Sequence, residues 1–153
     1  MEDVTIMKRA IEVAEAEPRY PFGALIVDSS SGEIVCEGVN RSSVNATWHG
    51  EIVAINRFYE LGEIAAADCV LYTTAEPCPM CQSAILWAGF QAVVYGTSIA
   101  YLTHRGWHQI QIPSDELCRR TPFSKCKIHG GILEQECNAL FDKALQLQAG
   151  EKA

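Results

Sequence analysis

Several features that define broad classes of protein are missing from this sequence. No apolar stretch approaches the roughly 18–20 residues that a membrane-spanning helix needs. The chain begins with the acidic stretch Met1-Glu2-Asp3-Val4, without the basic start and apolar run of a signal peptide. Internal repeats, low-complexity segments and linkers are also missing. We therefore expect a cytoplasmic protein with no membrane partner, whose residues 1–153 form a single domain.

An excess of positive charge is missing as well. Lys and Arg number 12 against 19 Asp and Glu, and the formal net charge is −7. Proteins that bind long polyanions normally rely on many Lys and Arg contacts to phosphates. The one basic cluster comprises Arg119, Arg120, Lys125 and Lys127, and we interpret it as a solvated surface. Nucleic acid is therefore not an expected partner, whereas a small molecule is.

Cysteine, in contrast, is abundant. An odd number of cysteines in a chain without a secretory signal argues against a framework of disulfide bonds. Metal ligands and buried free thiols explain the number better. The seven cysteines are Cys36, Cys69, Cys78, Cys81, Cys118, Cys126 and Cys137.

The pattern of apolar residues predicts alternating helices and strands, which is typical of α/β proteins with helices covering a sheet. Pro18 is expected to end the first helix, and Ser114 to cap a helix that begins near residue 114. The segment 97–112 receives no assignment. Helices are predicted at about residues 4–16, 49–59, 79–89 and 133–147, and strands at 24–27, 34–36, 70–74, 92–95 and 127–128.

Two short motifs carry the chemistry, and each lies where a helix is predicted to begin. The first is His49-Gly50-Glu51, and the second is Pro77-Cys78-Pro79-Met80-Cys81. Cysteines three residues apart in a first helical turn direct their sulfur atoms to the same side. The free N–H groups of a helix start also stabilise thiolates.

Together the two motifs predict a catalytic zinc site. His49, Cys78 and Cys81 supply three ligands, which leaves the fourth tetrahedral position for water. Zinc lowers the pKa of its bound water to roughly 7, so that hydroxide becomes available at neutral pH. Glu51 lies two residues after His49 and can shuttle the proton, which makes it the candidate catalytic residue.

Other readings of these residues stay open at this point. A structural zinc site would need a fourth ligand such as Cys69 or Cys118, and the chain would then be a zinc-stabilised interaction module. A redox Cys78/Cys81 pair would leave the His49 motif without a role. Cys118, Cys126 and His129 offer a looser set for a second metal.

The pairing of the two motifs is the H-x-E…P-C-x-x-C signature of zinc nucleobase deaminases. The chain resembles the cytidine deaminase superfamily over nearly its whole length. The resemblance implies a three-layer α/β/α fold around a central five-stranded mixed sheet, usually in a dimer or tetramer, of which we expect the homodimer. It also implies zinc on His49, Cys78 and Cys81, proton transfer by Glu51, and hydrolytic release of ammonia from a small nucleobase or nucleoside.

Three branches of that superfamily share segments with this chain. Pro21-Phe22-Gly23-Ala24 and the stretch from Glu76 to Cys81 resemble bacterial guanine deaminases. Ala46-Thr47-Trp48-His49-Gly50-Glu51 resembles fungal cytosine deaminase, and the segment 131–137 resembles the last helix of tRNA adenosine deaminases. We favour a guanine-type substrate, with cytosine and then tRNA adenosine as alternatives, although this chain lacks the aromatic tail with which bacterial guanine deaminases close their pocket.

The same resemblance suggests which residues contact the base. Asn40 matches the asparagine whose side-chain amide binds the base in all three branches. The segment 101–112 matches no branch well, but it follows the strand where family members build the pocket wall, so an aromatic residue there is expected to stack on the base. The candidate substrate-binding residues are Phe22, Asn40, Trp48, Gly50, Tyr101 and Trp107.

Overall fold

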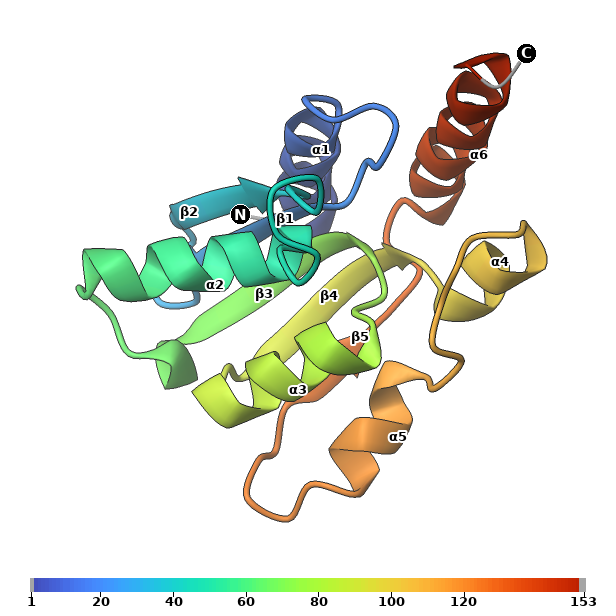
Figure 1. Ribbon diagram of the computed structural model, residues 1–153. Coiled ribbons are helices and arrows are strands. Elements are labelled where there is room, and N and C mark those ends of the chain that lie inside the picture. The colour runs from blue at the N-terminus through green and yellow to red at the C-terminus, as the bar shows by residue number, and fades with distance from the viewer. Residues whose placement is uncertain (1, 152–153) are drawn as a thin grey trace.

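The computed structural model describes residues 2–151 and shows a five-stranded sheet with helices on both faces (Figure 1). In chain order the elements are α1 Asp3–Ala14, β1 Gly23–Asp28, β2 Ile34–Val39, α2 Gly50–Leu61, the 3₁₀ turn η1 Ala66–Asp68, β3 Cys69–Ala75, α3 Pro79–Ala88, β4 Ala92–Thr97, α4 Ile99–His104, α5 Ser114–Arg119, β5 Lys127–His129 and α6 Glu134–Glu151. The expected five-stranded α/β architecture is confirmed.

The sheet is mixed, with the strand order β2-β1-β3-β4-β5. Strand β1 is antiparallel to both of its neighbours. A tight turn joins it to β2 on one side, and β3 pairs with its other edge. Strands β3, β4 and β5 are parallel, and α3 provides the crossover from β3 to β4. The carboxyl ends of β3 and β4 therefore lie at the same edge of the sheet.

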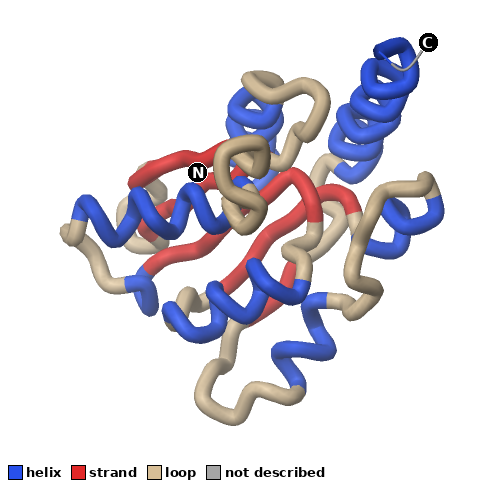
Figure 2. Tube along the Cα trace, viewed as in Figure 1, coloured by secondary structure: helices blue, strands red, loops and turns tan. Residues whose placement is uncertain are grey.

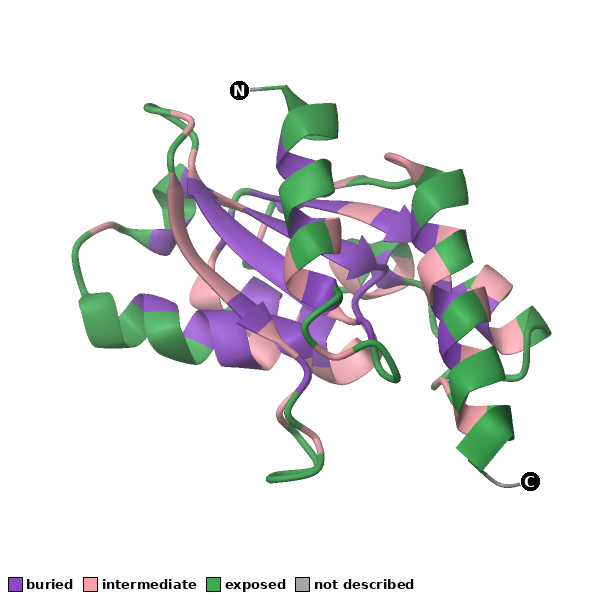
Figure 3. Ribbon diagram, turned by 90° about the horizontal axis from the view of Figure 1, so that it is seen from above, coloured by how far each residue is buried: buried purple, intermediate pink, exposed green. Residues whose placement is uncertain are grey.

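Alternate residues of the central strands face two separate apolar layers. Ala24, Ile26 and Leu71 pack with α2 and α3 on one face, together with Val93. On the other face, α1 and Cys137 of α6 cover a second set, which comprises Leu25, Val27, Tyr72 and Val94. Burial on both faces explains why these strands are continuous apolar runs instead of alternating ones. Seen from above, the largely buried sheet lies between helices that are each partly buried and partly exposed (Figure 3).

The structure departs from the expected elements in two places. Helix α1 ends at Ala14, four residues before Pro18, so the proline does not terminate it. Ser114 is the first residue of α5 rather than its cap, because its amide and hydroxyl both donate hydrogen bonds to Glu76. The segment that received no assignment contains α4, followed by an irregular loop that leads to α5 (Figure 2).

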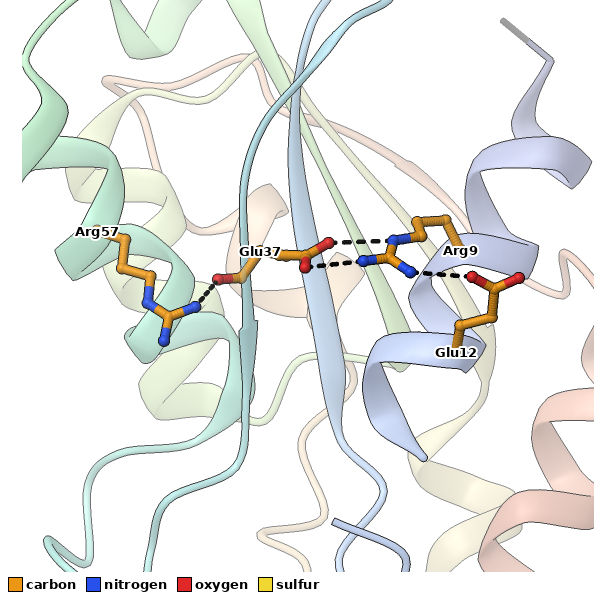
Figure 4. A network of polar contacts seen from close by, with 4 residues as sticks. All are labelled: Arg9, Glu12, Glu37 and Arg57. Carbon is orange, nitrogen blue, oxygen red and sulfur yellow. Dashed lines mark hydrogen bonds and ion pairs between the residues drawn. The ribbon is translucent and has the colours of Figure 1, made fainter. Parts of the chain in front are cut away.

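A polar network ties the edge strand β2 to both helical layers (Figure 4). Arg9 of α1 donates to both carboxylate oxygens of Glu37 in β2 and to Glu12. From the opposite layer, Arg57 of α2 donates to the main-chain oxygen of Glu37 at 2.6 Å. Because these side chains are largely exposed, we expect the network to contribute little to the free energy of unfolding. Its main effect is to keep the edge strand β2 in position between α1 and α2.

No helix within residues 2–151 is long and apolar enough to cross a membrane. The longest helix in this range, α6, has 18 residues, and several of them are charged.

The contribution of one hydrogen bond to the free energy of unfolding should be measurable. The hydroxyl of Tyr72 in β3 donates to Asp3 Oδ1 at 2.6 Å and fastens the first turn of α1 to the sheet. We expect Tyr72→Phe to lower the free energy of unfolding by about 1.5–3 kcal/mol, the range for a hydrogen bond to a charged group. Urea denaturation measures this change. The control Tyr59→Phe removes an exposed hydroxyl that has no partner within residues 2–151 and should leave the stability unchanged.

Candidate active site

The two predicted motifs meet because both helices begin on the same face of the sheet. His49 is the N-cap of α2, and Cys78 is the N-cap of α3, with Cys81 one turn further along. Gly50 lets α2 start close to the segment before β1, since a Cβ atom there would overlap the carbonyl oxygen of Phe22. This tight packing is the structural reason for glycine between His49 and Glu51.

The donor atoms of this group fit a tetrahedral zinc ion. His49 Nδ1 lies 3.5 Å from Cys78 Sγ and 3.6 Å from Cys81 Sγ, and the three donor atoms all lie within 4.8 Å of one another. Zn–N and Zn–S bonds of about 2.0 and 2.3 Å at tetrahedral angles separate two ligand atoms by about 3.6 Å. The two nitrogen–sulfur separations therefore suit zinc.

The electrostatics of the group also suit a cation. The pKa of Cys78 is lowered to about 4, because Cys81 and His49 donate hydrogen bonds to its sulfur against the opposing effect of burial. Cys78 is therefore a thiolate at neutral pH, the form in which cysteine binds zinc. The hydrogen bond to Cys78 in turn raises the pKa of His49.

Glu51 lies in the first turn of α2 with only 3% of its surface exposed. The hydroxyl of Thr73 in β3 lies 3.3 Å from Glu51 Oε1, and this hydroxyl also donates to the main-chain oxygen of Ala75. Burial and the neighbouring Cys78 raise the pKa of Glu51 to about 7. The carboxyl group is thus held in one place and binds a proton more readily than an exposed glutamate.

A cavity of about 520 Å³ opens beside this group. Its wall includes His49, Glu51 and Cys78 together with three of the expected substrate-binding residues, Phe22, Asn40 and Trp107. The amide of Ser42 donates to Asn40 Oδ1 at 2.7 Å, which fixes the orientation of that buried side chain. The structure therefore brings both motifs and half of the expected substrate contacts to one cavity.

The other three expected substrate residues lie outside the cavity wall. The hydroxyl of Tyr101 donates to Asp142 of α6 at 2.7 Å, so this ring braces two helices. The guanidinium carbon of Arg41 lies 5.5 Å from the centre of the Trp48 ring. Gly50 is buried against the chain at Phe22. Trp107, in contrast, belongs to the cavity wall, and its ring makes an edge-to-face contact with the ring of Phe22.

Sequence reasoning missed several residues of the cavity wall. Glu76 is buried and accepts hydrogen bonds from the amides of Ile99 and Ser114, each at 2.8 Å. Its position directly before the Cys78 motif was the only available signal. The remaining missed residues come from loops and from α6, which have no motif: Tyr20, Ser42, Gly106, His108, Gln109, Leu145 and Gln148.

Cys118, Cys126 and His129 do not form a second metal site. Within residues 2–151, the group suited to a metal consists of His49, Cys78 and Cys81. Cys118 instead accepts a hydrogen bond from the amide of Gln82 at 3.5 Å, and Cys126 belongs to the apolar core. A structural zinc site with Cys69 or Cys118 as fourth ligand is not formed either.

The arrangement defines a class of enzyme. A His-Cys-Cys group that suits zinc leaves the fourth ligand position to water, and it lies beside a buried carboxyl group in a cavity. These are the parts of a zinc-dependent hydrolase.

A sequence model of the cytidine and deoxycytidylate deaminase zinc-binding region matches residues 1–97. The chain belongs to this family and is a zinc-dependent hydrolytic deaminase. It is 38% identical over 136 residues to the guanine deaminase of Bacillus subtilis, which covers 80% of this chain and 85% of that protein. It is 31% identical over 156 residues to a tRNA-specific adenosine deaminase of Haemophilus influenzae, which covers 98% and 87% of the two chains.

Solved structures show the same fold. The structure of a guanine deaminase from Nitrosomonas europaea superposes with a TM-score of 0.81 at 23% identity, covering 94% of this chain and 84% of that chain. This likeness supports the three-layer architecture described above.

Zinc binding can be tested without any substrate. We expect one zinc ion per chain, and we expect Cys81→Ala to lose it because two ligands do not hold the metal tightly. Inductively coupled plasma mass spectrometry of the purified proteins measures the stoichiometry. As a control, Cys36→Ala removes a half-buried thiol in β2 and should retain one zinc. A Cys81→Ala protein that still holds one zinc per chain would contradict the assigned ligands.

Proposed function

We propose that this protein hydrolyses the exocyclic amino group of an aminopurine of the guanine type and releases ammonia. The observation that carries the proposal is the buried carboxyl group of Glu51, which lies beside the His49, Cys78 and Cys81 group at the inner end of the cavity. The guanine preference is supported by the 38% identity to the guanine deaminase of Bacillus subtilis.

The proposed roles follow from the positions of the side chains. His49, Cys78 and Cys81 would hold zinc, which when bound supplies electrophilic activation of a water molecule. Glu51 accepts a proton from the attacking water and delivers it to the leaving amino group. The ring carbon gains the oxygen and loses the nitrogen, so that one water is consumed and one ammonia is released.

The walls of the cavity would orient the base. Asn40 offers a side-chain amide whose oxygen is already engaged by Ser42, which leaves its N–H groups for the substrate. Phe22 and Trp107 supply apolar surface, and their edge-to-face contact at 5.5 Å keeps both rings in place. We propose these three residues as the substrate contacts.

Charge on the surface favours a small substrate over a nucleic acid. Arg119 pairs with Asp115, and Arg120 pairs with Glu116, so half of the basic cluster is neutralised.

We further propose that the protein forms a homodimer. Trp87, with 77% of its surface exposed, forms an apolar patch with the ring of Phe123, and such a patch is typical of a protein interface.

A panel of substrates tests the reaction. The zinc-loaded protein is incubated separately with guanine, guanosine, cytosine, cytidine, adenine and adenosine, and ammonia release is measured. We expect turnover of a guanine-type compound and little turnover of the adenine pair. Turnover confined to the cytosine pair would replace the aminopurine with a pyrimidine, and silence on all six compounds by a protein with one zinc per chain would contradict the proposed function.

The role of Glu51 has its own test. We expect Glu51→Gln to keep the fold and one zinc per chain but to lower kcat by about 10²–10⁴-fold, the usual contribution of a general acid–base group. Steady-state kinetics and metal analysis measure both effects. Glu60→Gln makes the same change at an exposed position of α2 and serves as the control. Normal turnover by Glu51→Gln would exclude Glu51 as the proton shuttle.

A further inference from the structure

Glu76 is a buried carboxylate without a cationic partner. The residue is 7% exposed, and none of the ion pairs among the described residues includes it. Its Oε1 accepts a hydrogen bond from the amide of Ile99, and its Oε2 accepts from the amide and the hydroxyl of Ser114, each at 2.8 Å. A buried charge is costly unless hydrogen bonds satisfy it, and bonds to a charged acceptor are stronger than neutral ones. The carboxylate is therefore stabilised by the two residues that it holds.

These two residues lie at opposite ends of the 99–114 segment. Ile99 is the first residue of α4, and Ser114 is the first residue of α5. Figure 1 shows the chain leaving β4 through α4 and returning at α5, which packs against α3. The amide of Glu76 also donates to the main-chain oxygen of Thr97, the last residue of β4, at 2.7 Å. One residue therefore closes the segment and joins it to the sheet.

The two halves of the 99–114 segment are held differently. Tyr101 and Arg105 both donate to Asp142 of α6, which gives α4 a second attachment. Within residues 2–151, the stretch 108–112 forms no hydrogen bond with another part of the chain. The position of this returning half therefore depends on its end at Ser114, where Glu76 holds the chain.

The 99–114 segment also carries one wall of the cavity. Residues 106–109 all belong to that wall, and the ring centres of Trp107 and Phe22 lie 5.5 Å apart. Phe22 is placed independently, because the hydroxyl of Thr74 in β3 bonds to the main chain on both sides of it. A shift of the 99–114 segment would therefore move Trp107 relative to Phe22.

We propose that Glu76 is a positioning residue for substrate binding. Its carboxylate holds both ends of the 99–114 segment and thereby sets the position of Trp107 opposite Phe22. The side-chain bonds of Glu76 go to that segment and not to the zinc-ligand group, so its effect falls on the fit of the substrate. The inference rests on the proposed function, because Phe22 and Trp107 are the proposed substrate contacts.

A first test separates substrate binding from chemistry in the zinc-loaded full chain. Glu76→Gln keeps the size of the side chain, but its NH₂ group cannot accept a hydrogen bond, so a donor at Ile99 or Ser114 loses its partner. We expect KM to rise at least about tenfold, kcat to change less than about threefold, and one zinc per chain to remain. Steady-state kinetics and metal analysis measure these effects. Glu63→Gln makes the same change at an exposed position and should match the wild type.

A second test needs no substrate. Hydrogen–deuterium exchange followed by mass spectrometry reports how readily each segment opens. We expect peptides from residues 99–114 to exchange at least about tenfold faster in Glu76→Gln, the effect of losing a hydrogen bond to a charged group. Peptides from α2 and α3 should exchange at the wild-type rate. Ser114→Ala removes the hydroxyl donor alone and should show the same changes to a smaller extent.

The results distinguish a failure of this inference from a failure of the proposed function. Unchanged exchange of residues 99–114 in Glu76→Gln would overturn the positioning role, and so would loss of zinc or a lower kcat at an unchanged KM. Should circular dichroism show Glu76→Gln to be unfolded, Ser114→Ala decides, and wild-type KM and exchange in that variant would overturn the inference. A wild-type protein that turns over no base or nucleoside would contradict the proposed function, and the exchange rates would still decide whether Glu76 holds the segment.

Discussion

Two helices that begin at the same edge of a buried sheet create the active site. Helices α2 and α3 pack on one face of the central strands, and the side chains of their N-cap residues meet, with His49 Nδ1 3.5 Å from Cys78 Sγ. Close packing at Gly50 makes this approach possible. Because zinc tolerates little error in the distances between its ligands, the metal centre depends on how both helices are seated. Glu51 takes its position from the same helix start.

The buried carboxylate of Glu76 extends this arrangement to the cavity wall. Glu76 lies two residues before Cys78 and accepts hydrogen bonds from the first residues of α4 and α5. Charge-assisted bonds of this kind are short and directional. The wall segment after α4 is therefore positioned relative to the zinc ligands, although it lacks regular structure. One side chain thus connects the segment of the metal-binding motif with the wall of the cavity.

Local patterns predicted most of the strands and helices, because burial on two faces leaves continuous apolar runs at 24–27, 70–74 and 92–95. Local patterns were less informative where a side chain forms a hydrogen bond with a residue that is distant in the sequence. The side chain of Ser114 has the chemistry of a helix cap, but Glu76 lies nearby in space and takes its hydrogen bonds. Tyr101 was expected at the base, but Asp142, 41 residues later, engages its hydroxyl. Neither partner is visible from neighbouring residues.

The amino-acid sequence was enough to predict the kind of metal centre and the proposed proton-transfer group, because zinc chemistry requires particular residue types at spacings that short motifs display. The same reasoning predicted the five-stranded α/β fold. Which residues line the cavity, how large it is and which polar atoms lack partners became apparent from the folded structure alone. Those properties arise where loops and α6 from distant parts of the chain converge, and no local pattern records such contacts.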